Sequence, residues 1–162
     1  MFLVIEHGRR NILHFNVTPD PTSDQVVQQL RQTFPEAGPY RYVILDRDAK
    51  FDAEVMGFLQ TTGLKTKRTS VRAPWQNGTA ERWVGSCRRE ILDHVIAWNE
   101  THLRRLIRDY ITFYHDDRIH DSLNKDTPDG RPVELRPSRF ATVTSSPRLG
   151  GVHHRYGWVE AA

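Results

Sequence analysis

The chain has 162 residues, of which 38% are hydrophobic and 27% charged, with a net charge of +3 at pH 7. This composition predicts one soluble globular domain with a core and excludes an intrinsically disordered chain. The longest opening apolar run, residues 1–5, is too short to span a bilayer and lacks the layout of a signal peptide. A single cysteine, Cys87, excludes an intramolecular disulfide and favours a reducing, cytoplasmic location.

The N-terminal part of the chain predicts alternating strands and helices. Residues 2–6 and 11–17 read as two strands joined in a hairpin by residues 7–10. Thr22 or Ser23 can cap a helix that ends before Pro35, and its apolar positions are Val26, Val27, Leu30 and Phe34. A buried strand is expected at 42–45, a helix at 51–61 and a further short strand at 64–67. This order of elements is typical of an α/β fold.

The C-terminal part predicts two helices and a tail. After a loop at 69–74, which we expect to be mobile, a long helix is predicted over 76–98. Ala80, Val84, Cys87, Ile91 and Val95 fall at steps of three and four, so they share one face of this helix. Asn99 can cap the next helix. Residues 126–162 are predicted to be a tail, mostly coil with one short strand at 140–143, after a core domain over 1–125.

Two segments resemble a known family. Residues 74–90 read P-W-Q-N-G-T-A-E-R-W-V-G-S-C-R-R-E, and they resemble the signature around the last acidic residue of the integrase/transposase core, the DDE recombinases. The likeness continues through L-D-H-V-I, H-L-R-R and Y-H-x-x-R-x-H-x-S-L-x-K-D. Upstream, V-I-L-D-R-D-A-K-F at 43–51 is similar to the segment around the middle aspartate of that family. The two motifs stand in the family's order.

The resemblance implies a fold and a function. The expected fold is ribonuclease H-like, a mixed sheet with flanking helices, but the chain begins where the family's second strand would be. We therefore expect an integrase core that is truncated at its N-terminus. The implied function is DNA integration, as in DNA transposition, through metal-dependent strand transfer. The implied partners are DNA, both mobile-element ends and target, and further copies of the chain in a homo-oligomer, with no membrane.

The candidate catalytic and metal-binding residues are Asp46 and Glu81. Asp46 matches the family's middle aspartate, because an aromatic residue, Phe51, follows five positions later; Asp48 does not match. In an intact family member two Mg²⁺ or Mn²⁺ ions relieve charge during phosphoryl transfer, and carboxylates are suitable ligands. Purely structural alternatives stay open. Asp46 can pair with Arg47 or Lys50, and Glu81 can complement the helix dipole.

A third acid is missing from the motif. The acids that precede Asp46 do not match the family's first position: they are Glu6, Asp20, Asp24 and Glu36. Activity is therefore expected to be impaired. Another acidic group could be offered as a metal site, but we interpret it as a polar helix end; it comprises His115, Asp116, Asp117, His120 and Asp121.

Basic residues cluster in the middle of the chain. Residues 65–105 hold nine Lys or Arg against four acids, a balance that suits a polyanion but also an ordinary solvated helix face. Arg89, for example, could simply pair with Asp93. The residues predicted to bind DNA are Lys65, Lys67, Arg68, Arg72, Asn77, Arg82, Arg88 and Arg89.

Two other functions remain open at this point. The chain could be a catalytically dead nucleic-acid-binding remnant or an interfering transposase fragment, which would bind DNA independently of metal. It could also be a plain structural domain or an unfolded relic.

Overall fold

The computed structural model describes residues 1–19, 21–35 and 38–160, so two of the acids considered above, Asp20 and Glu36, lie outside the described residues. The chain divides into two compact units, Met1–Gly85 and Ser86–Ala162. Each unit is described here by itself. The predicted boundary between a core over 1–125 and a tail over 126–162 stays a prediction.

The first unit opens with the expected hairpin. Strands β1 (Phe2–Ile5) and β2 (Ile12–Asn16) pair antiparallel, with a register shift between Val4 and Ile5. Helix α1 (Ser23–Thr33) follows, and Thr22 is its N-cap. The Thr22 side chain accepts from the backbone N–H of Gln25, and the Gln25 side chain accepts from that of Thr22, which is a complete capping box.

A parallel strand pair completes the first unit. Strand β3 (Tyr42–Leu45) leads into α2 (Ala53–Thr61) and then into β4 (Lys65–Arg68), which pairs parallel to β3 in the register Tyr42↔Lys65 to Leu45↔Arg68. Helix α2 begins later than predicted because Asp52 is its N-cap, accepting from the N–H groups of Glu54 and Val55. The predicted strands and helices from β1 to β4 are therefore confirmed to within one or two residues.

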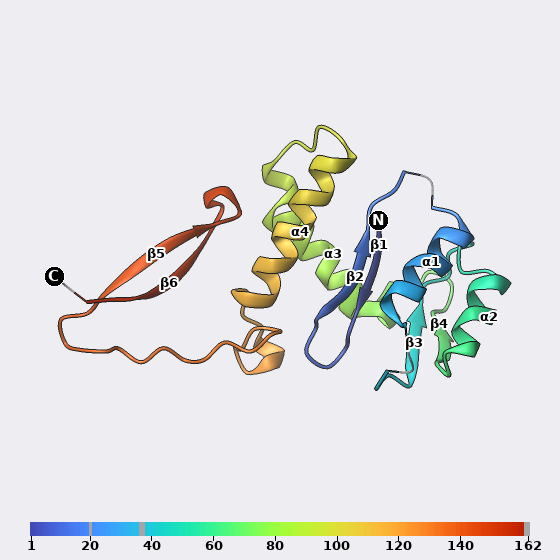
Figure 1. The fold of residues 1–162 in the computed structure, drawn as a ribbon, viewed down its shortest axis with the longest axis horizontal. Helices are drawn as coiled ribbons and strands as arrows, with labels where there is room; N and C mark the ends of the chain where they lie inside the picture. Colours follow the sequence, from blue (N-terminus) through green and yellow to red (C-terminus); the bar gives the residue numbers. More distant parts are fainter. Residues whose placement is uncertain (20, 36–37, 161–162) are drawn as a thin grey trace. The chain divides into compact units, whose positions relative to one another are not determined.

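The core of the first unit lies where α1 and α2 cover the strands. Its buried members come from both helices and both ends of the parallel pair: Val26, Val27, Leu30, Phe34, Leu45, Val55, Leu59 and Leu64. Phe2 and Val4 of β1 and Val43 of β3 pack against this cluster. In the described residues, however, β1–β2 and β3–β4 form two separate two-stranded sheets instead of one continuous mixed sheet. Figure 1 shows the two ladders.

Helix α3 (Gly78–Glu90) follows a 3₁₀ turn at Pro74–Asn77 and is shorter than the predicted helix over 76–98. It ends because Ile91, at φ −139° and ψ −48°, leaves the helical region, after which a 3₁₀ turn spans Leu92–His94. The predicted inward face is also wrong at Val84, and Val95 lies beyond the end of the helix. Trp83 is 1% exposed and Val84 is 44% exposed, because the buried stripe runs through Trp83, Cys87 and Ile91 at steps of four.

The second unit contains helix α4 and a C-terminal hairpin. Asn99 caps α4 (Glu100–Asp116) by accepting from the N–H of His102, as predicted. The buried face of α4 consists of Ile107, Tyr110, Phe113 and Tyr114. Strands β5 (Thr142–Arg148) and β6 (His153–Val159) pair antiparallel along their whole length, which corrects the expectation of coil with one short strand. Among the described residues no helix is both long and apolar enough to cross a membrane.

Cys87 behaves as the core residue that its position predicted. Its side chain is buried and unpaired with any other sulfur. Burial raises the pKa of the Cys87 thiol to about 12, with a smaller contribution from the charge of Glu90. The thiol therefore stays protonated at neutral pH and serves packing, not chemistry.

Candidate metal and nucleic-acid site

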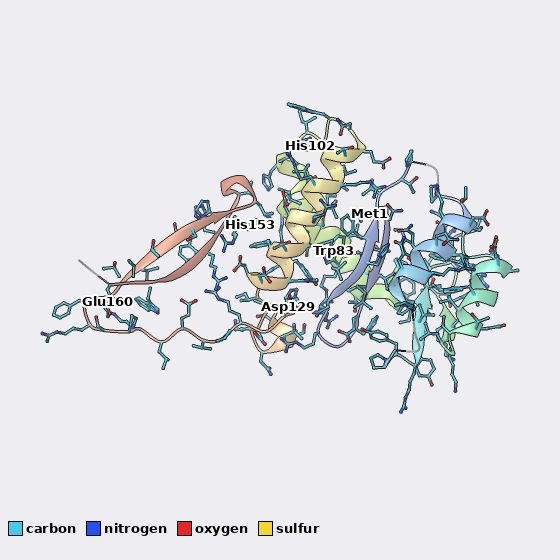
Figure 2. All side chains as sticks on the ribbon, viewed as in Figure 1. Met1, Trp83, His102, Asp129, His153 and Glu160 are labelled. Atoms are coloured by element: carbon cyan, nitrogen blue, oxygen red, sulfur yellow. The ribbon has the colours of Figure 1, made fainter. Side chains whose placement is uncertain are left out.

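A pocket of about 520 Å³ lies within the first unit. All of β1 and all of β3 line it, together with residues of α1 and the first turns of α3. Met1, labelled in Figure 2 at the start of β1, is part of this lining. The polar residues in the lining include Asp46, Asp48, Asn77 and Glu81. The two acids predicted from separate motifs therefore face one cavity.

Asp46 comes directly after β3, so its carboxylate projects from the end of a strand. Its Oδ1 accepts a hydrogen bond of 3.0 Å from the side-chain amide of Asn77, which is 9% exposed. In the described part of the chain no Lys or Arg pairs with Asp46. The alternative that Lys50 neutralises this acid does not hold, because Lys50 pairs with Asp48 instead, at 2.9 Å.

Asp48 is thereby distinguished from Asp46. A side-chain hydrogen bond from Lys50, helped by the backbone N–H of Lys50, lowers the pKa of Asp48. The backbone carbonyl of Asp48 also accepts from Arg68 at 3.4 Å. Asp48 is thus held in a local turn with its charge compensated, as expected for a structural acid.

Glu81 lies in the first turn of α3 and is exposed, and no ion pair to it occurs among residues 1–19, 21–35 and 38–160. Asn77 precedes it by four positions, and the intervening Gly78 has helical dihedrals of φ −59° and ψ −21°. Residues four apart on a helix have Cβ atoms about 5–6 Å apart. The bond between Asn77 and Asp46 therefore brings Glu81 into the neighbourhood of Asp46. The position of Glu81 also complements the helix dipole, so the structural role remains compatible with it.

The pair provides hard oxygen ligands without a compensating protein cation, which fits a divalent ion such as Mg²⁺. A search of the described residues finds no group of three or more His, Cys, Asp or Glu side chains placed to hold a metal. Asp46 and Glu81 would therefore supply two protein carboxylates and no more.

Hydrogen bonds hold the loop before α3 in the structure, and its expected mobility stays a prediction. The N–H of Ser70 donates to Oε1 of Gln76 at 2.6 Å, and Nε2 of Gln76 donates back to Oγ of Ser70 at 3.3 Å. The N–H of Thr69 donates to the carbonyl of Leu45 at 3.0 Å. From the hairpin, Arg10 donates to the hydroxyl of Thr79 at 2.8 Å. These bonds fix the start of α3 relative to the end of β3.

The predicted DNA-binding residues fall into three groups. The first group consists of exposed residues of the first unit: Lys65, Lys67, Arg68, Arg72 and Arg82. Arg88 and Arg89 are exposed in the last turn of α3, beyond the unit boundary, and Arg88 contacts Asp93 at 3.4 Å. Asn77 differs from all of these, since its amide is buried and bonded to Asp46. No local sequence signal shows that contact, because the two residues are 31 positions apart.

Two partly or fully buried acids of the second unit, Glu90 and Asp117, are paired with arginines. Glu90 accepts from Arg118 at 2.7 Å and from the hydroxyl of Tyr110 at 2.9 Å. Burial by itself raises the pKa of Glu90, but the hydrogen bonds and charge of Arg118 outweigh it, so the net pKa is lowered. Asp117, 4% exposed at its side chain, pairs with Arg148 at 2.6 Å and Arg155 at 3.2 Å. These contacts support the interpretation of the His115–Asp121 region as structural. The sequence analysis missed Glu90 as an ion-pair partner.

Comparisons with known proteins give three findings. Residues 62–128 match the family model described as the integrase core domain, a range that contains Glu81 but not Asp46. No curated protein matches the chain.

Among solved structures, the chain is similar to a chain in the cryo-EM structure of the simian T-cell lymphotropic virus intasome in complex with PP2A regulatory subunit B56 gamma. The TM-score is 0.60 at 11% sequence identity, over 97% of this chain and 59% of that one. The likeness shows the fold, a mixed α/β arrangement of the ribonuclease H-like kind. This chain spans only 59% of the length of its structural relative.

Proposed function

We propose that the chain is a catalytic core of the integrase/transposase type and that it acts in DNA integration through metal-dependent strand transfer. The observation that carries the proposal is that Asp46 and Glu81 line one pocket and that neither pairs with a protein cation among the described residues. Asp48, by contrast, has its charge compensated by Lys50 at 2.9 Å, as is usual for an acid kept for stability.

In this proposal Asp46 and Glu81 hold Mg²⁺ or Mn²⁺, two ions in the complete site. Such ions stabilise the negative charge that develops on attacking and leaving oxygens in phosphoryl transfer. Asn77 acts as a positioning residue, because its amide holds Oδ1 of Asp46 and leaves Oδ2 without a hydrogen-bond partner in the described part of the chain. The anchored loop at 69–76 keeps Asn77 in place.

The proposed substrate is DNA, at the ends of a mobile element and at its target, and the active form is a homo-oligomer in the cytoplasm. The proposed phosphate contacts are Lys65, Lys67, Arg68, Arg72, Arg82, Arg88 and Arg89. Lys65 and Lys67 are two positions apart along β4, so their side chains project to the same face. Exposed Lys and Arg give sequence-independent affinity that falls as salt rises.

Catalysis by this chain alone is proposed to be impaired, because two acids provide fewer ligands than two metal ions need. The same observation favours a second candidate function, a nucleic-acid-binding protein that interferes with transposition and has no metal-dependent step.

The test combines DNA binding with strand transfer. A fluorescent duplex is titrated with the chain at low and moderate salt, and strand transfer of an end-labelled duplex is measured with Mg²⁺ or Mn²⁺. The proposal predicts salt-sensitive binding and weak, metal-dependent strand transfer that Glu81→Gln abolishes and Asp48→Asn retains. Binding that is indifferent to EDTA and to Asp46→Asn, without strand transfer, would favour the second function. Absence of salt-sensitive DNA binding would contradict both.

A further inference from the structure

The hairpin of β5 and β6 in the second unit has two different faces. Side chains alternate between the faces along each strand, and residues that pair directly share a face. Arg148 pairs with His153 in the register, so one face contains Arg148, His153 and Arg155. Arg148 and Arg155 both form ion pairs with Asp117, and the His153 ring stacks on Phe113 with centroids 4.7 Å apart. This face therefore packs against the C-terminal part of α4.

The opposite face of the hairpin carries three rings, and we call it the aromatic face. His154, Tyr156 and Trp158 occupy every second position of β6. The ring centroids of His154 and Tyr156 are 6.4 Å apart, with an angle of 32° between the ring planes. Tyr156 is 61% exposed, and Val143, which pairs with Trp158 in the register, is 60% exposed. The rings are thus presented to solvent along one strand.

The fold makes little use of these rings. In the described part of the chain, neither the His154 side chain nor the Tyr156 hydroxyl has a hydrogen-bond partner. Trp158 is held in place, because its Nε1 donates to the carbonyl of Glu134 at 3.2 Å. Contiguous exposed apolar surface on a soluble protein is typical of a binding site. The aromatic face therefore suits a ligand better than it serves the core.

A cavity of about 320 Å³ adjoins the aromatic face. Val143, Tyr156 and Trp158 line it from the hairpin. Arg131 and Val133 line it from the connector before β5, residues 131–141. The guanidinium group of Arg131 donates to the carbonyl of Tyr156 at 2.9 Å, which holds the connector beside β6. A planar group that lies on the Tyr156 ring would thus also meet the wall that the connector provides.

The connector also brings positive charge to the rings. Residues 131–160 contain five arginines and two glutamates. Arg136 and Arg139 have no carboxylate partner among the described residues. Their guanidinium carbons lie 5.5 Å and 4.6 Å from the ring centroids of Trp158 and Phe140, respectively. Arginines beside aromatic rings provide charge for a phosphate next to a surface for a base.

We propose that the aromatic face binds single-stranded nucleic acid, with bases on the rings of His154 and Tyr156 and phosphates at Arg136 and Arg139. Neighbouring bases in a duplex strand are stacked about 3.4 Å apart, whereas the two rings are 6.4 Å apart. Bases that lie on successive rings must therefore be unstacked, which a single strand permits and a duplex does not.

The aromatic face is separate from the candidate metal site. It lies outside residues 62–128, which match the integrase core domain, and no metal ion is needed for a base to lie on a ring. Binding there is therefore independent of Asp46 and Glu81, and it adds a preference for unpaired strands that the exposed lysines and arginines of the first unit do not provide.

The probe is a fluorescent oligomer of about twelve deoxythymidines, within the usual length that a single-strand-binding surface covers. An abasic oligomer of the same length keeps the phosphates and lacks the bases, so it isolates the electrostatic contribution. A uridine oligomer tests whether the sugar matters, and a DNA duplex tests the discrimination against paired strands. Binding to the full 162-residue chain is followed by fluorescence anisotropy in EDTA at several salt concentrations.

The deoxythymidine oligomer is expected to bind at least about tenfold more tightly than the abasic oligomer, because bases on rings add affinity. Tyr156→Leu should remove most of this difference, since leucine keeps the apolar bulk without the ring, and Tyr156→Phe should keep it. The matched control is Trp98→Ala, which removes an 84% exposed ring outside the hairpin and should bind as the parent does. Unchanged binding of the abasic oligomer by Tyr156→Leu would show that this variant is folded.

The charge at the connector is tested separately. Arg139→Ala should weaken binding of the deoxythymidine and abasic oligomers alike by a fewfold and lower the slope of log affinity against log salt, since it removes a phosphate contact. Arg105→Ala, which removes an exposed arginine of α4, is the control and should change neither. Tyr156→Leu should leave duplex binding as it is in the parent.

Equal affinity for the deoxythymidine and abasic oligomers would overturn the inference, because the bases would then contribute nothing. The same holds if Trp98→Ala loses as much affinity as Tyr156→Leu, or if Tyr156→Leu weakens duplex binding equally. A dimer in sedimentation that Tyr156→Leu disrupts would assign the rings to contacts between copies of the chain and would also overturn it. Equal binding of the uridine oligomer would support a site for either nucleic acid. Oligomer binding that persists in Asp46→Asn would support this site whether or not strand transfer is found.

Discussion

The acids of the two units are treated differently by their surroundings. In the second unit Glu90 and Asp117 each pair with arginine, and Asp117 is nearly buried by its two partners. Among the described residues of the first unit, Asp46 accepts a hydrogen bond from the amide of Asn77, and neither Asp46 nor Glu81 has a cationic partner. Carboxylates are thus paired with arginine at Glu90 and Asp117, whereas Asp46 and Glu81 have no cationic partner among the described residues, and we propose that they bind a ligand.

The strand edges differ in the same way. In the second unit β5 and β6 pair over seven residues each and form an exposed, largely polar hairpin. Among the described residues of the first unit, β1 and β3 have apolar side chains and one unpaired edge each. Unpaired apolar edges promote association with other chains, whereas the exposed rings of β6 suit the bases of a nucleic acid.

The largest difference between the acids is expected in the rate of strand transfer. Asp46→Asn and Glu81→Gln are expected to lower metal-dependent strand transfer by at least about a hundredfold, because each removes a proposed metal ligand. Asp48→Asn is the matched control and should stay within a fewfold of the parent chain. Initial rates of strand transfer with Mn²⁺ measure the effect. Equal losses in Asp48→Asn would show that the distinction between these acids is wrong.

The free energy of unfolding should depend on the paired acid Glu90 more than on Asp46. Glu90→Gln is expected to lower the free energy of unfolding by about 2 kcal/mol, since it leaves the partly buried Arg118 without its charge partner. Asp46→Asn should change it by less than about 0.5 kcal/mol, because no protein cation loses a partner. Urea unfolding followed by circular dichroism gives both values. A larger loss of unfolding free energy in Asp46→Asn than in Glu90→Gln would contradict the proposed difference between these two acids.

The variant Asn77→Ala tests the role of the side-chain amide of Asn77. Removing the hydrogen bond to Oδ1 of Asp46 is expected to weaken Mn²⁺ binding by about tenfold, as is usual for residues that orient metal ligands. Asn77→Asp is the complementary variant, because it adds a carboxylate that can repel Asp46 or join the site. Calorimetric titration with Mn²⁺ measures the affinity. An unchanged affinity in Asn77→Ala would make this amide purely structural.

The smallest effects are expected on the DNA-binding surface. Lys67→Ala and Arg72→Ala should each weaken DNA binding a fewfold and reduce the slope of log affinity against log salt by about one, since each removes one phosphate contact. Lys125→Ala, an exposed lysine of the second unit paired with Asp121, is the control. Fluorescence anisotropy at several salt concentrations gives the slopes. Identical slopes in all three variants would show that Lys67 and Arg72 do not belong to the DNA-binding surface.

Local signals predicted much of the fold. The caps at Thr22 and Asn99 could be predicted because capping depends on neighbouring residues in the sequence. Strand β3 could be predicted from its apolar run. Strands β5 and β6 were not, because their polar sequences lack the alternation that a half-buried strand shows. The end of α3 was also missed, since no glycine or proline follows it.

The candidate acids could be proposed from motifs, but their surroundings could not. Lys50 is two positions from Asp48 and four from Asp46, and the sequence does not decide between them; the turn after β3 does. The Asn77 contact with Asp46 joins distant segments and depends on how β3 and α3 pack. The split between two ladders likewise depends on pairing in space and has no local sequence signal.

The most direct measurement is calorimetric titration of Mn²⁺ into the parent chain and three variants, Asp46→Asn, Glu81→Gln and Asp48→Asn. The account predicts that the parent and Asp48→Asn bind Mn²⁺ alike, while Asp46→Asn and Glu81→Gln each bind at least about tenfold more weakly. Equal affinity in all four proteins, or no binding by the parent, would contradict a metal site formed by Asp46 and Glu81.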